Sequence, residues 1–400
     1  MRDIFTSRRE VLRMIGLSGA AALVACAPIT PPTPTVAPTA TATPEDKTLR
    51  IGYLPITDAA PLLLAHARAL YAAEGVDAAR PTLLRSWAQV AEAFQAKQVD
   101  VVHILMPTAI WMKFGQGFPA KVVAWDHTDG SALTVANGIA SVEDLAGKTV
   151  AVPFWYSIHN LVLQLLLKKA GLKPILNGDP AKADGTVKLI VMAPADMPPA
   201  LGNGAIAGFI VADPFNAVAE VNKVGKIARF TGDVWLNHAC CVVLMHEDDT
   251  VNRPKWAQGV VTALAKAQVW ARENRVEAAK VLSKDGGNYL PQSLPVIERA
   301  LTYFDPVEYQ ATRAVTHTDW KNHRIDFQPF PFPSYTEELV RLLKDTAVEG
   351  DDAFLKALDP AQAHAKLVDD RFARVAIAAA GGAAKFGIPE TLSRTERIAP

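Results

Sequence analysis

The residues best suited to chemistry in this sequence are two adjacent cysteines, Cys240 and Cys241, which follow His238. Such a pair can stay as packed free thiols, form a strained vicinal disulfide, contact a ligand or help to bind a metal ion. We expect packed free thiols and no metal site, because His238 and two cysteines lack a convincing fourth ligand. Adjacent cysteines cannot join distant parts of a fold, so the core must hold by packing.

Several carboxylates and one histidine are candidate acids and bases, notably Asp58, Asp213 and His159. The sequence has no Gly-x-Ser-x-Gly elbow, no His-Glu-x-x-His motif and no glycine loop that would hold a phosphate. The three residues also lie on two lobes that we expect to move apart when the binding site opens, which argues against their acting together as a catalytic group. We therefore expect a binding protein without catalytic residues or a cofactor, and an exported enzyme is the main alternative.

The elements that must position these residues alternate between strands and helices. This alternation is typical of a mostly parallel sheet with helices on its faces. The pattern restarts near residue 141, and from Pro254 onward the chain is almost wholly helical. Two successive α/β units predict two lobes with a ligand cleft between them. Strands are expected, among others, at 49–54, 99–105, 121–125, 149–152, 207–211 and 242–245, and helices at 60–73, 87–97, 158–170, 254–273 and 334–347.

Ligands in open α/β sheets bind beyond the carboxyl ends of the strands. Polar or helix-opening residues occur at several such ends, and the simpler alternative for each is a helix cap or a core position. The candidates at these ends are Thr57, Asp58, Pro107, His159, Asp213 and Asn216.

The N-terminal residues read as an export signal. An apolar stretch from Met14 to Ala25, roughly 12 residues, is too short to span a ~30 Å hydrocarbon core. The preceding Arg8-Arg9 pair resembles a twin-arginine signal, with a Sec signal as the alternative. The run 23–26 resembles a lipobox, so we expect residues 1–26 to be a signal peptide and Cys26 to be lipidated. An uncleaved short membrane anchor is the alternative.

Composition and patterning complete the predicted domain plan. The chain has 41 basic and 41 acidic residues, which gives no argument for a nucleic-acid partner. We expect an extracytoplasmic, lipid-anchored monomer, with hinges near 134–138 and 236–240. The predicted parts are a disordered Pro/Thr-rich tether at 27–47, lobe 1 at 48–136 plus 239–375, lobe 2 at 137–238, and a flexible tail at 376–400.

Several short motifs resemble the periplasmic nitrate- and bicarbonate-binding proteins of ABC importers, from about residue 49 to about residue 375. The resemblance implies a two-lobed class II periplasmic-binding-protein fold that closes on a small-molecule solute and delivers it to a permease and its ATPase. This family is related to sulfonate- and thiamine-precursor-binding proteins. A related pyrimidine-precursor synthase keeps the enzymatic alternative open. The motifs are Val152 to Asn160, Thr57 to Leu62, Ser86 to Ala88, Asp213 to Ala217 and Asp233 to Trp235.

The resemblance also implies a ligand site. Nitrate binders hold their anion with a tryptophan, a glutamine, a histidine and a lysine. The tryptophan falls on Trp87 and the histidine on His159, but the glutamine falls on Ser131 and the lysine on Cys241. A buried anion without a compensating cation carries a large desolvation cost.

We therefore expect a small organic ligand, either a planar heterocycle or an organic acid or sulfonate, rather than nitrate. Nitrate or bicarbonate is the alternative. Aromatic side chains suit a flat ligand because they offer stacking surfaces. The resemblance places Phe154, Trp155, Tyr156 and Trp235 beside Trp87 in the presumed cleft.

Overall fold

The computed structural model describes residues 47–317, 320 and 323–400. The expected signal peptide, its cysteine Cys26 and the tether up to residue 46 lie outside the described residues. Lys47, the last residue of the expected tether, pairs instead with two carboxylates of the body, Asp100 at 3.0 Å and Asp249 at 2.6 Å. Along the described residues, no helix has both the length and the apolar character needed to cross a bilayer.

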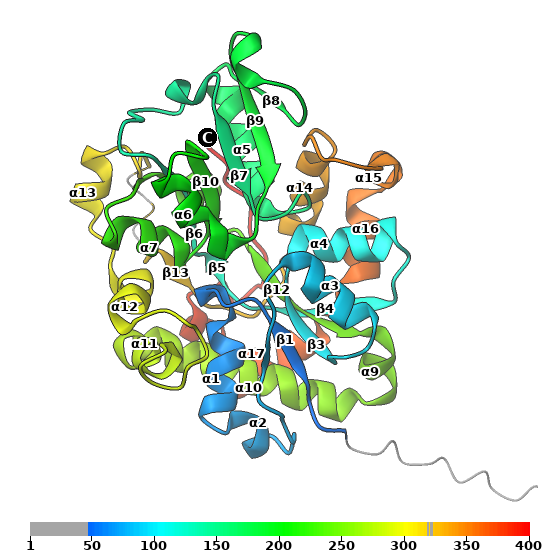
Figure 1. Cartoon of the computed structure of the whole chain (residues 1–400). Coiled ribbons are helices and arrows are strands. Elements are labelled where there is room, and N and C mark those ends of the chain that lie inside the picture. The colour runs from blue at the N-terminus through cyan, green and yellow to red at the C-terminus, as the bar shows by residue number, and fades with distance from the viewer. Residues whose placement is uncertain (1–46, 318–319, 321–322) are drawn as a thin grey trace, which may run out of the picture. The chain divides into compact units, whose positions relative to one another are not determined.

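A five-stranded sheet, the first sheet, forms one half of the described body (Figure 1). Its β1 pairs in parallel with β2 and β3, whereas β12 runs antiparallel to both β3 and β4. All residues of β3 and β12 are buried, as expected for strands covered on both faces. In spatial order the strands are β2 (Thr82–Leu83), β1 (Ile51–Tyr53), β3 (Val101–Leu105), β12 (Cys241–His246) and β4 (Ala120–Trp125).

A six-stranded sheet, the second sheet, forms the other half. Its strands β8, β9, β7 and β10 are parallel, and β6 runs antiparallel to β10 and β11. Both sheets therefore contain parallel and antiparallel pairs. The antiparallel strand is β12 in the first sheet and β6 in the second sheet, and each is the strand by which the chain enters that sheet from the other one. The order is β11 (Lys226–Phe230), β6 (Ser131–Val135), β10 (Gly208–Ala212), β7 (Thr149–Val152), β9 (Thr186–Val191) and β8 (Lys173–Ile175).

Helices cover both sheets, and several begin where the sequence predicts. Ser86 and Ser157 accept backbone hydrogen bonds at the N-termini of α3 and α5, from Gln89 at 3.2 Å and Asn160 at 3.0 Å. The long α10 begins with Pro254 and packs against α1 and α17. The helices are α1 (Ala60–Ala67), α2 (Leu70–Ala73), α3 (Trp87–Gln95), α4 (Met106–Ile110), α5 (Ile158–Lys169), α6 (Met197–Gly202), α7 (Phe215–Val221), α8 (Thr231–Val234), α9 (Glu247–Asn252), α10 (Pro254–Glu273), α11 (Arg275–Leu282), α12 (Leu294–Thr302), α13 (Pro306–Ala311), α14 (Pro333–Leu343), α15 (Ala353–Ala357), α16 (Pro360–Leu367) and α17 (Arg371–Ala379).

Two chain segments that cross between the sheets lie side by side. The backbone N–H of Asp129 donates to the carbonyl of His238 at 2.9 Å, and that of Asp126 donates to the carbonyl of Cys241 at 3.3 Å. A short pair, β5 (Thr128–Asp129) with β13 (Ile325–Asp326), adds a third segment between the sheets (Figure 1). Because β6 already pairs within the second sheet, the first crossing lies near 126–130, ahead of the predicted boundary at 136 and the predicted hinge at 134–138.

Part of the C-terminal region belongs with the second sheet, not with lobe 1 as expected. Ala132 and Phe230 of the second sheet share an apolar cluster with Tyr309 and Trp320. The rings of Phe230 and Tyr309 meet edge to face with centroids 4.8 Å apart. Within the range 239–375, which the sequence assigns to lobe 1, the chain therefore returns to the second sheet and covers its aromatic side chains.

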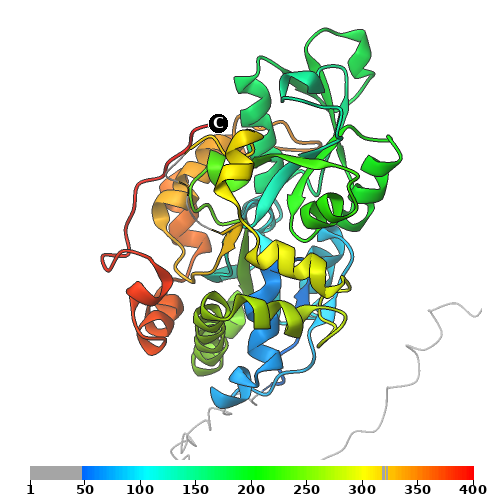
Figure 2. The ribbon, with the colours of Figure 1, turned by 90° about the vertical axis from the view of Figure 1, so that its left-hand side faces the viewer.

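The C-terminal residues 376–400, which the sequence predicts to be a flexible tail, pack along the rest of the described chain (Figure 2). Phe386 is buried, and the last residues run along α8. The indole N–H of Trp235 donates to Glu396 at 2.8 Å, and the backbone N–H of Ala399 donates to the carbonyl of Val234 at 2.8 Å. The polar composition of this segment reflects its partly exposed course, while its backbone and Glu396 satisfy groups that would otherwise be buried without partners.

Candidate functional site

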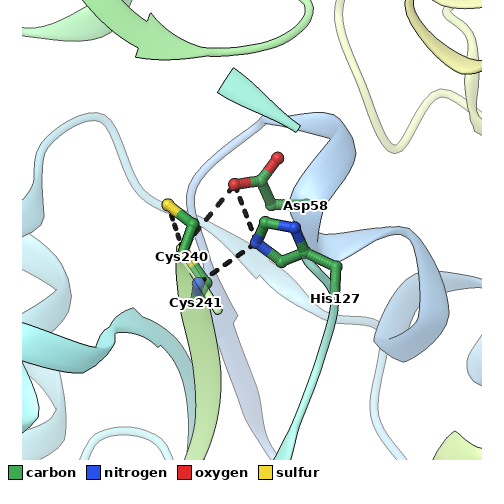
Figure 3. Close-up of side chains that lie close together, drawn as sticks. All are labelled: Asp58, His127, Cys240 and Cys241. Carbon is green, nitrogen blue, oxygen red and sulfur yellow. Dashed lines mark hydrogen bonds and ion pairs between the residues drawn. The ribbon is translucent and has the colours of Figure 1, made fainter. Parts of the chain in front are cut away.

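Four side chains from three separate segments meet beside the crossing segments (Figure 3). Asp58 comes from the turn after β1, His127 from the first crossing, and Cys240 and Cys241 from the second crossing. We call these four residues the thiol cluster; all four are fully buried. The two sulfurs lie 3.7 Å apart as free thiols, and Cys241 Sγ lies 3.8 Å from Asp58 Oδ2. The structure thus joins the predicted Asp58 and Cys241 with His127, which was not predicted.

His127 and Asp58 share a proton. Their Nε2 and Oδ2 atoms are 2.9 Å apart, and the backbone N–H of Cys241 also donates to His127 Nε2 at 3.1 Å. Burial raises the pKa of Asp58 to about 7, and the Asp58 carboxylate raises the pKa of His127 although burial opposes it. The second carboxylate oxygen, Asp58 Oδ1, has no hydrogen-bond partner among the described residues.

The predicted residues Ser131 and His159 meet across the site. Ser131 begins β6, and His159 lies in the first turn of α5, where the Ser157 cap fixes the start of the helix. Ser131 Oγ lies 2.9 Å from His159 Nε2, and Cys240 Sγ lies 3.7 Å from the same nitrogen. Both residues are buried, and His159 Nδ1 has no partner within the described part of the chain. The second sheet thus contributes a hydroxyl and an imidazole next to the thiol cluster.

The two thiols differ in acidity. Burial would raise the pKa of Cys240, but the hydrogen bond with Cys241 and the imidazoles of His159 and His127 outweigh burial and lower it well below its ordinary value. Burial and the neighbouring Cys240 and Asp58 raise the pKa of Cys241 well above its ordinary value. Because a thiolate is the form that attacks electrophiles and binds metals, Cys240 is the more reactive of the pair.

Three predicted residues have structural partners instead of unsatisfied groups. Thr57 donates its hydroxyl to the carbonyl of Asp213 at 2.9 Å and so connects the two sheets. Asp213 accepts from Ala217 N–H at 3.1 Å in the first turn of α7, as a helix cap would, and lies 3.4 Å from the guanidinium of Arg324. Asn216 accepts from Thr134 at 2.8 Å and donates to the carbonyl of Val211 at 2.8 Å.

Trp87 and Pro107 lie in the core of the first sheet's half. Trp87 is 1% exposed, its ring lies 5.9 Å from that of His103, and its indole N–H has no partner among the described residues. Pro107 is in the first turn of α4, and the next residue, Thr108, donates its hydroxyl to the carbonyl of Tyr156 at 2.7 Å. This second hydroxyl contact also joins the two sheets.

The predicted aromatic residues do not form one wall. Trp155 and Tyr156 line a pocket of ≈ 330 Å³, whose other lining residues include Trp111, Phe154 and Phe354. Trp235 instead packs against Tyr335 with ring centroids 5.0 Å apart, under the C-terminal segment. The aromatic side chains are thus divided among the pocket, the core position of Trp87 and the packing around Trp235.

Sequence reasoning missed a group of buried polar residues that follow β4. Asp126 lies 3.8 Å from His103, and burial raises the pKa of Asp126 well above its usual range and lowers that of His103 to about 3, so this pair favours its neutral forms. The signal was available, because the pair Asp126-His127 directly follows the strand predicted at 121–125. Polar residues at the carboxyl end of a buried strand are typical of ligand sites.

The fold and the family follow from comparison with known proteins. The chain is 26% identical over 379 residues to the nitrate/nitrite binding protein NrtA of Synechococcus elongatus, covering 85% of this chain and 82% of that protein. It is 27% identical over 274 residues to the NrtA protein of a Nostoc species, covering 63% of this chain and 60% of that protein.

A crystal structure of the periplasmic nitrate-binding protein NrtA from Synechocystis superposes with a TM-score of 0.71 at 20% identity, covering 88% of this chain and 93% of that one. This likeness shows that the fold is the predicted two-lobed periplasmic-binding-protein fold. A model of the NMT1-like family matches residues 42–283. That match covers more than half of the sequence, and the chain therefore belongs to the NMT1-like family.

Proposed function

We propose that this protein is the solute-binding component of an ABC importer, which captures a small solute between its lobes and delivers it to a permease and its ATPase. The observation that carries the proposal is the buried group formed by Ser131, His159 and Cys240, in which each lobe supplies part of one site. Because both lobes contribute, a ligand held there stabilises the closed arrangement. The names of the relatives support transport, since one is a nitrate import ATP-binding protein and others are nitrate- or bicarbonate-binding proteins.

We further propose an extracytoplasmic monomer that is lipidated at Cys26. Its functional partners are then the solute, the permease, the ATPase and, through the lipid, the membrane. The proposed lobe 1 contains the first sheet and the proposed lobe 2 contains the second sheet with Tyr309, Ala314, Val315 and Trp320, which adjusts the boundaries expected from sequence.

The proposed solute is a small organic molecule rather than nitrate. Within residues 47–400 apart from 318–319 and 321–322, the contacts of Ser131, His159 and the thiol cluster include no lysine or arginine side chain. Arg324, which is buried nearby, pairs with Asp213 and Glu220. The imidazole of His127 is already paired with the Asp58 carboxylate, so a nitrate ion in such a site would have no lysine or arginine side chain to compensate its charge, at a large electrostatic cost.

Nitrate or bicarbonate is the second candidate, and the names of the relatives favour it. Isothermal titration with nitrate, bicarbonate, taurine, a thiamine-precursor pyrimidine and riboflavin distinguishes an organic solute from an inorganic anion. We expect one of the organic compounds to bind and nitrate and bicarbonate not to bind. Tight binding of either inorganic anion would overturn the choice of solute, and mass analysis of the bound compound checks that it is returned unchanged.

A substitution at His159 tests whether the solute binds at the proposed site. His159→Ala removes the imidazole that contacts Ser131 and Cys240, and we expect a loss of affinity of about 10-fold or more, because a buried hydrogen bond contributes roughly 1–2 kcal/mol. The matched control is His364→Ala, since His364 contacts Thr336 in another part of the fold. Equal affinity in the two variants would argue against a binding site at His159.

A further inference from the structure

We propose that the thiol cluster is a binding site for one thiophilic divalent transition-metal ion, with Zn²⁺ as the representative. Each of the four residues offers one ligand atom, and we assign Sγ of Cys240 and of Cys241 together with Nε2 of His127 and Oδ2 of Asp58, the two atoms that already face each other. Two sulfurs, one imidazole and one carboxylate make a four-ligand set that zinc-class ions prefer. The site goes beyond the proposed transport role, because metal binding can be measured without any transported solute.

The distances agree with tetrahedral coordination. All four ligand atoms lie within 4.8 Å of one another. Two sulfurs that bind one zinc at ~2.3 Å in a tetrahedron are about 3.8 Å apart, and Cys240 Sγ and Cys241 Sγ are 3.7 Å apart. A sulfur and a carboxylate oxygen on the same ion are about 3.5 Å apart, and Cys241 Sγ and Asp58 Oδ2 are 3.8 Å apart.

The edge between the imidazole nitrogen and the carboxylate oxygen needs a small adjustment. His127 Nε2 and Asp58 Oδ2 share a proton at 2.9 Å, and they would separate to about 3.3 Å when a metal replaces that proton. The backbone nitrogen of Cys241 lies 3.1 Å from the same His127 Nε2, so this edge of the imidazole ring faces the cluster. The imidazole therefore needs no rotation to act as a ligand.

Charge and burial also favour a cation here. A bound metal ion would replace the thiol protons, and it would then face two thiolates and one carboxylate in a fully buried site. Asp58 Oδ1 has no partner among the described residues, so the carboxylate is incompletely satisfied without a further group. A divalent ion compensates most of this buried negative charge.

The structure also explains why sequence reasoning rejected a metal site. The histidine considered there, His238, contacts Thr231 at 2.9 Å and is absent from the cluster. Its place is taken by His127, and Asp58 supplies the missing fourth ligand. Both residues lie far from the cysteines in sequence, so neither could be identified from local spacing.

The experiment uses the whole protein, reduced and freed of metal with a chelator. Added Co²⁺ should bind at one ion per chain and give a thiolate-to-cobalt absorption band together with the strong visible bands of tetrahedral cobalt. Zn²⁺ should displace it. Absence of these bands, or bands of octahedral cobalt without the thiolate transition, would overturn the proposal.

Ligand variants and one control locate the ion. Cys240→Ser, Cys241→Ser and His127→Gln should each weaken Co²⁺ binding by about 100-fold or more. His238→Gln changes a buried histidine close by that is not a ligand, and it should leave the cobalt spectrum and affinity unchanged. Wild-type affinity in all three ligand variants contradicts the assignment.

A second measurement avoids variants that fail to fold. Wild-type protein is treated with a thiol-alkylating reagent under mildly denaturing conditions, with and without Zn²⁺, and analysed by mass spectrometry. Bound metal should slow alkylation of Cys240 and Cys241 together at least 10-fold. Equal rates contradict the site, as does a mass two hydrogens lower in freshly purified protein, which would identify a vicinal disulfide.

Discussion

At the scale of single residues, one buried guanidinium holds a key junction of the structure together. Arg324 directly precedes β13, is 2% exposed, and contacts both Asp213 and Glu220. Glu220 also binds Arg299 at 3.0 Å. Burial alone would raise the pKa of Glu220, but the two guanidinium groups outweigh burial and hold it below its ordinary value. The carboxylate is thus stabilised in its charged form in the folded protein.

This network predicts an acid-dependent stability difference for Glu220→Gln. At pH 7 we expect the free energy of unfolding of the variant to be about 3 kcal/mol lower than that of the parent, because Arg324 keeps its charge and loses its main partner. Since the pKa of Glu220 is lower in the folded than in the unfolded state, its contribution is present above about pH 4.5 and is lost as pH falls through the folded-state pKa. Urea unfolding at several pH values should therefore show a difference in unfolding free energy between parent and variant that becomes smaller as the pH falls.

The matched control for this prediction is Glu277→Gln, which removes a carboxylate from an exposed pair with Lys280. Exposed pairs contribute about 0–1 kcal/mol, so this variant should stay close to the parent at every pH. A difference for Glu220→Gln that is small at pH 7, or that stays constant toward acid, would contradict the role given to the carboxylate.

At the scale of elements, short sequence patterns correctly predicted those helices and strands that depend on contacts between residues close in sequence. The caps at Ser86 and Ser157, the apolar strands and the long helix from Pro254 all appear where the sequence places them, because each depends on neighbours within a few residues. The short pair of β5 with β13 was missed, since two residues in each strand give no periodic pattern. The C-terminal segment was missed because its burial depends on Trp235, more than 150 residues away.

The C-terminal segment is the element whose role is easiest to test. Ending the chain after Ile388 removes Glu396, which accepts from Trp235, and Arg394, whose guanidinium lies 5.0 Å from the ring centre of Trp125. We expect a loss of about 3 kcal/mol in unfolding free energy, because a buried indole N–H is left without its partner and stacking is lost. Urea denaturation of the shortened and full chains measures this loss of unfolding free energy.

Glu396→Gln is the control for the shortened chain. Its amide oxygen can still accept from the indole of Trp235, so it should cost about 1 kcal/mol or less. An unchanged urea midpoint in the shortened chain would mean that residues 389–400 contribute nothing and that the prediction of a flexible tail was right.

At the scale of the whole molecule, the site depends on topology that no local pattern records. Asp58 and Cys241 are 183 residues apart, and they meet only because β12 returns the chain to the first sheet beside β3 and β4. The sequence could therefore propose Asp58, Ser131, His159 and Cys241 one by one through a family resemblance. It could not show that His127 joins them, or that Trp155 and Trp235 lie elsewhere.

The proposed closure of the two lobes can be tested at two hydroxyl contacts that join the two sheets. Thr108 donates to the carbonyl of Tyr156 at 2.7 Å, and Thr57 donates to the carbonyl of Asp213 at 2.9 Å. Both hydroxyls are buried, and valine has nearly the shape of threonine without the donor. Removing either hydroxyl therefore tests the balance between open and closed forms with little change in packing.

We expect Thr108→Val to shift that balance about 5-fold toward the open form, since one buried hydrogen bond contributes about 1 kcal/mol. Small-angle scattering of the ligand-free protein should then give a larger radius of gyration, and solute affinity should fall by a similar factor, because closure becomes less favourable. Thr302→Val, which removes a contact within α12 only, should change neither quantity. If Thr108→Val also changes neither, the lobes are held together by other contacts, and closure does not depend on this hydroxyl.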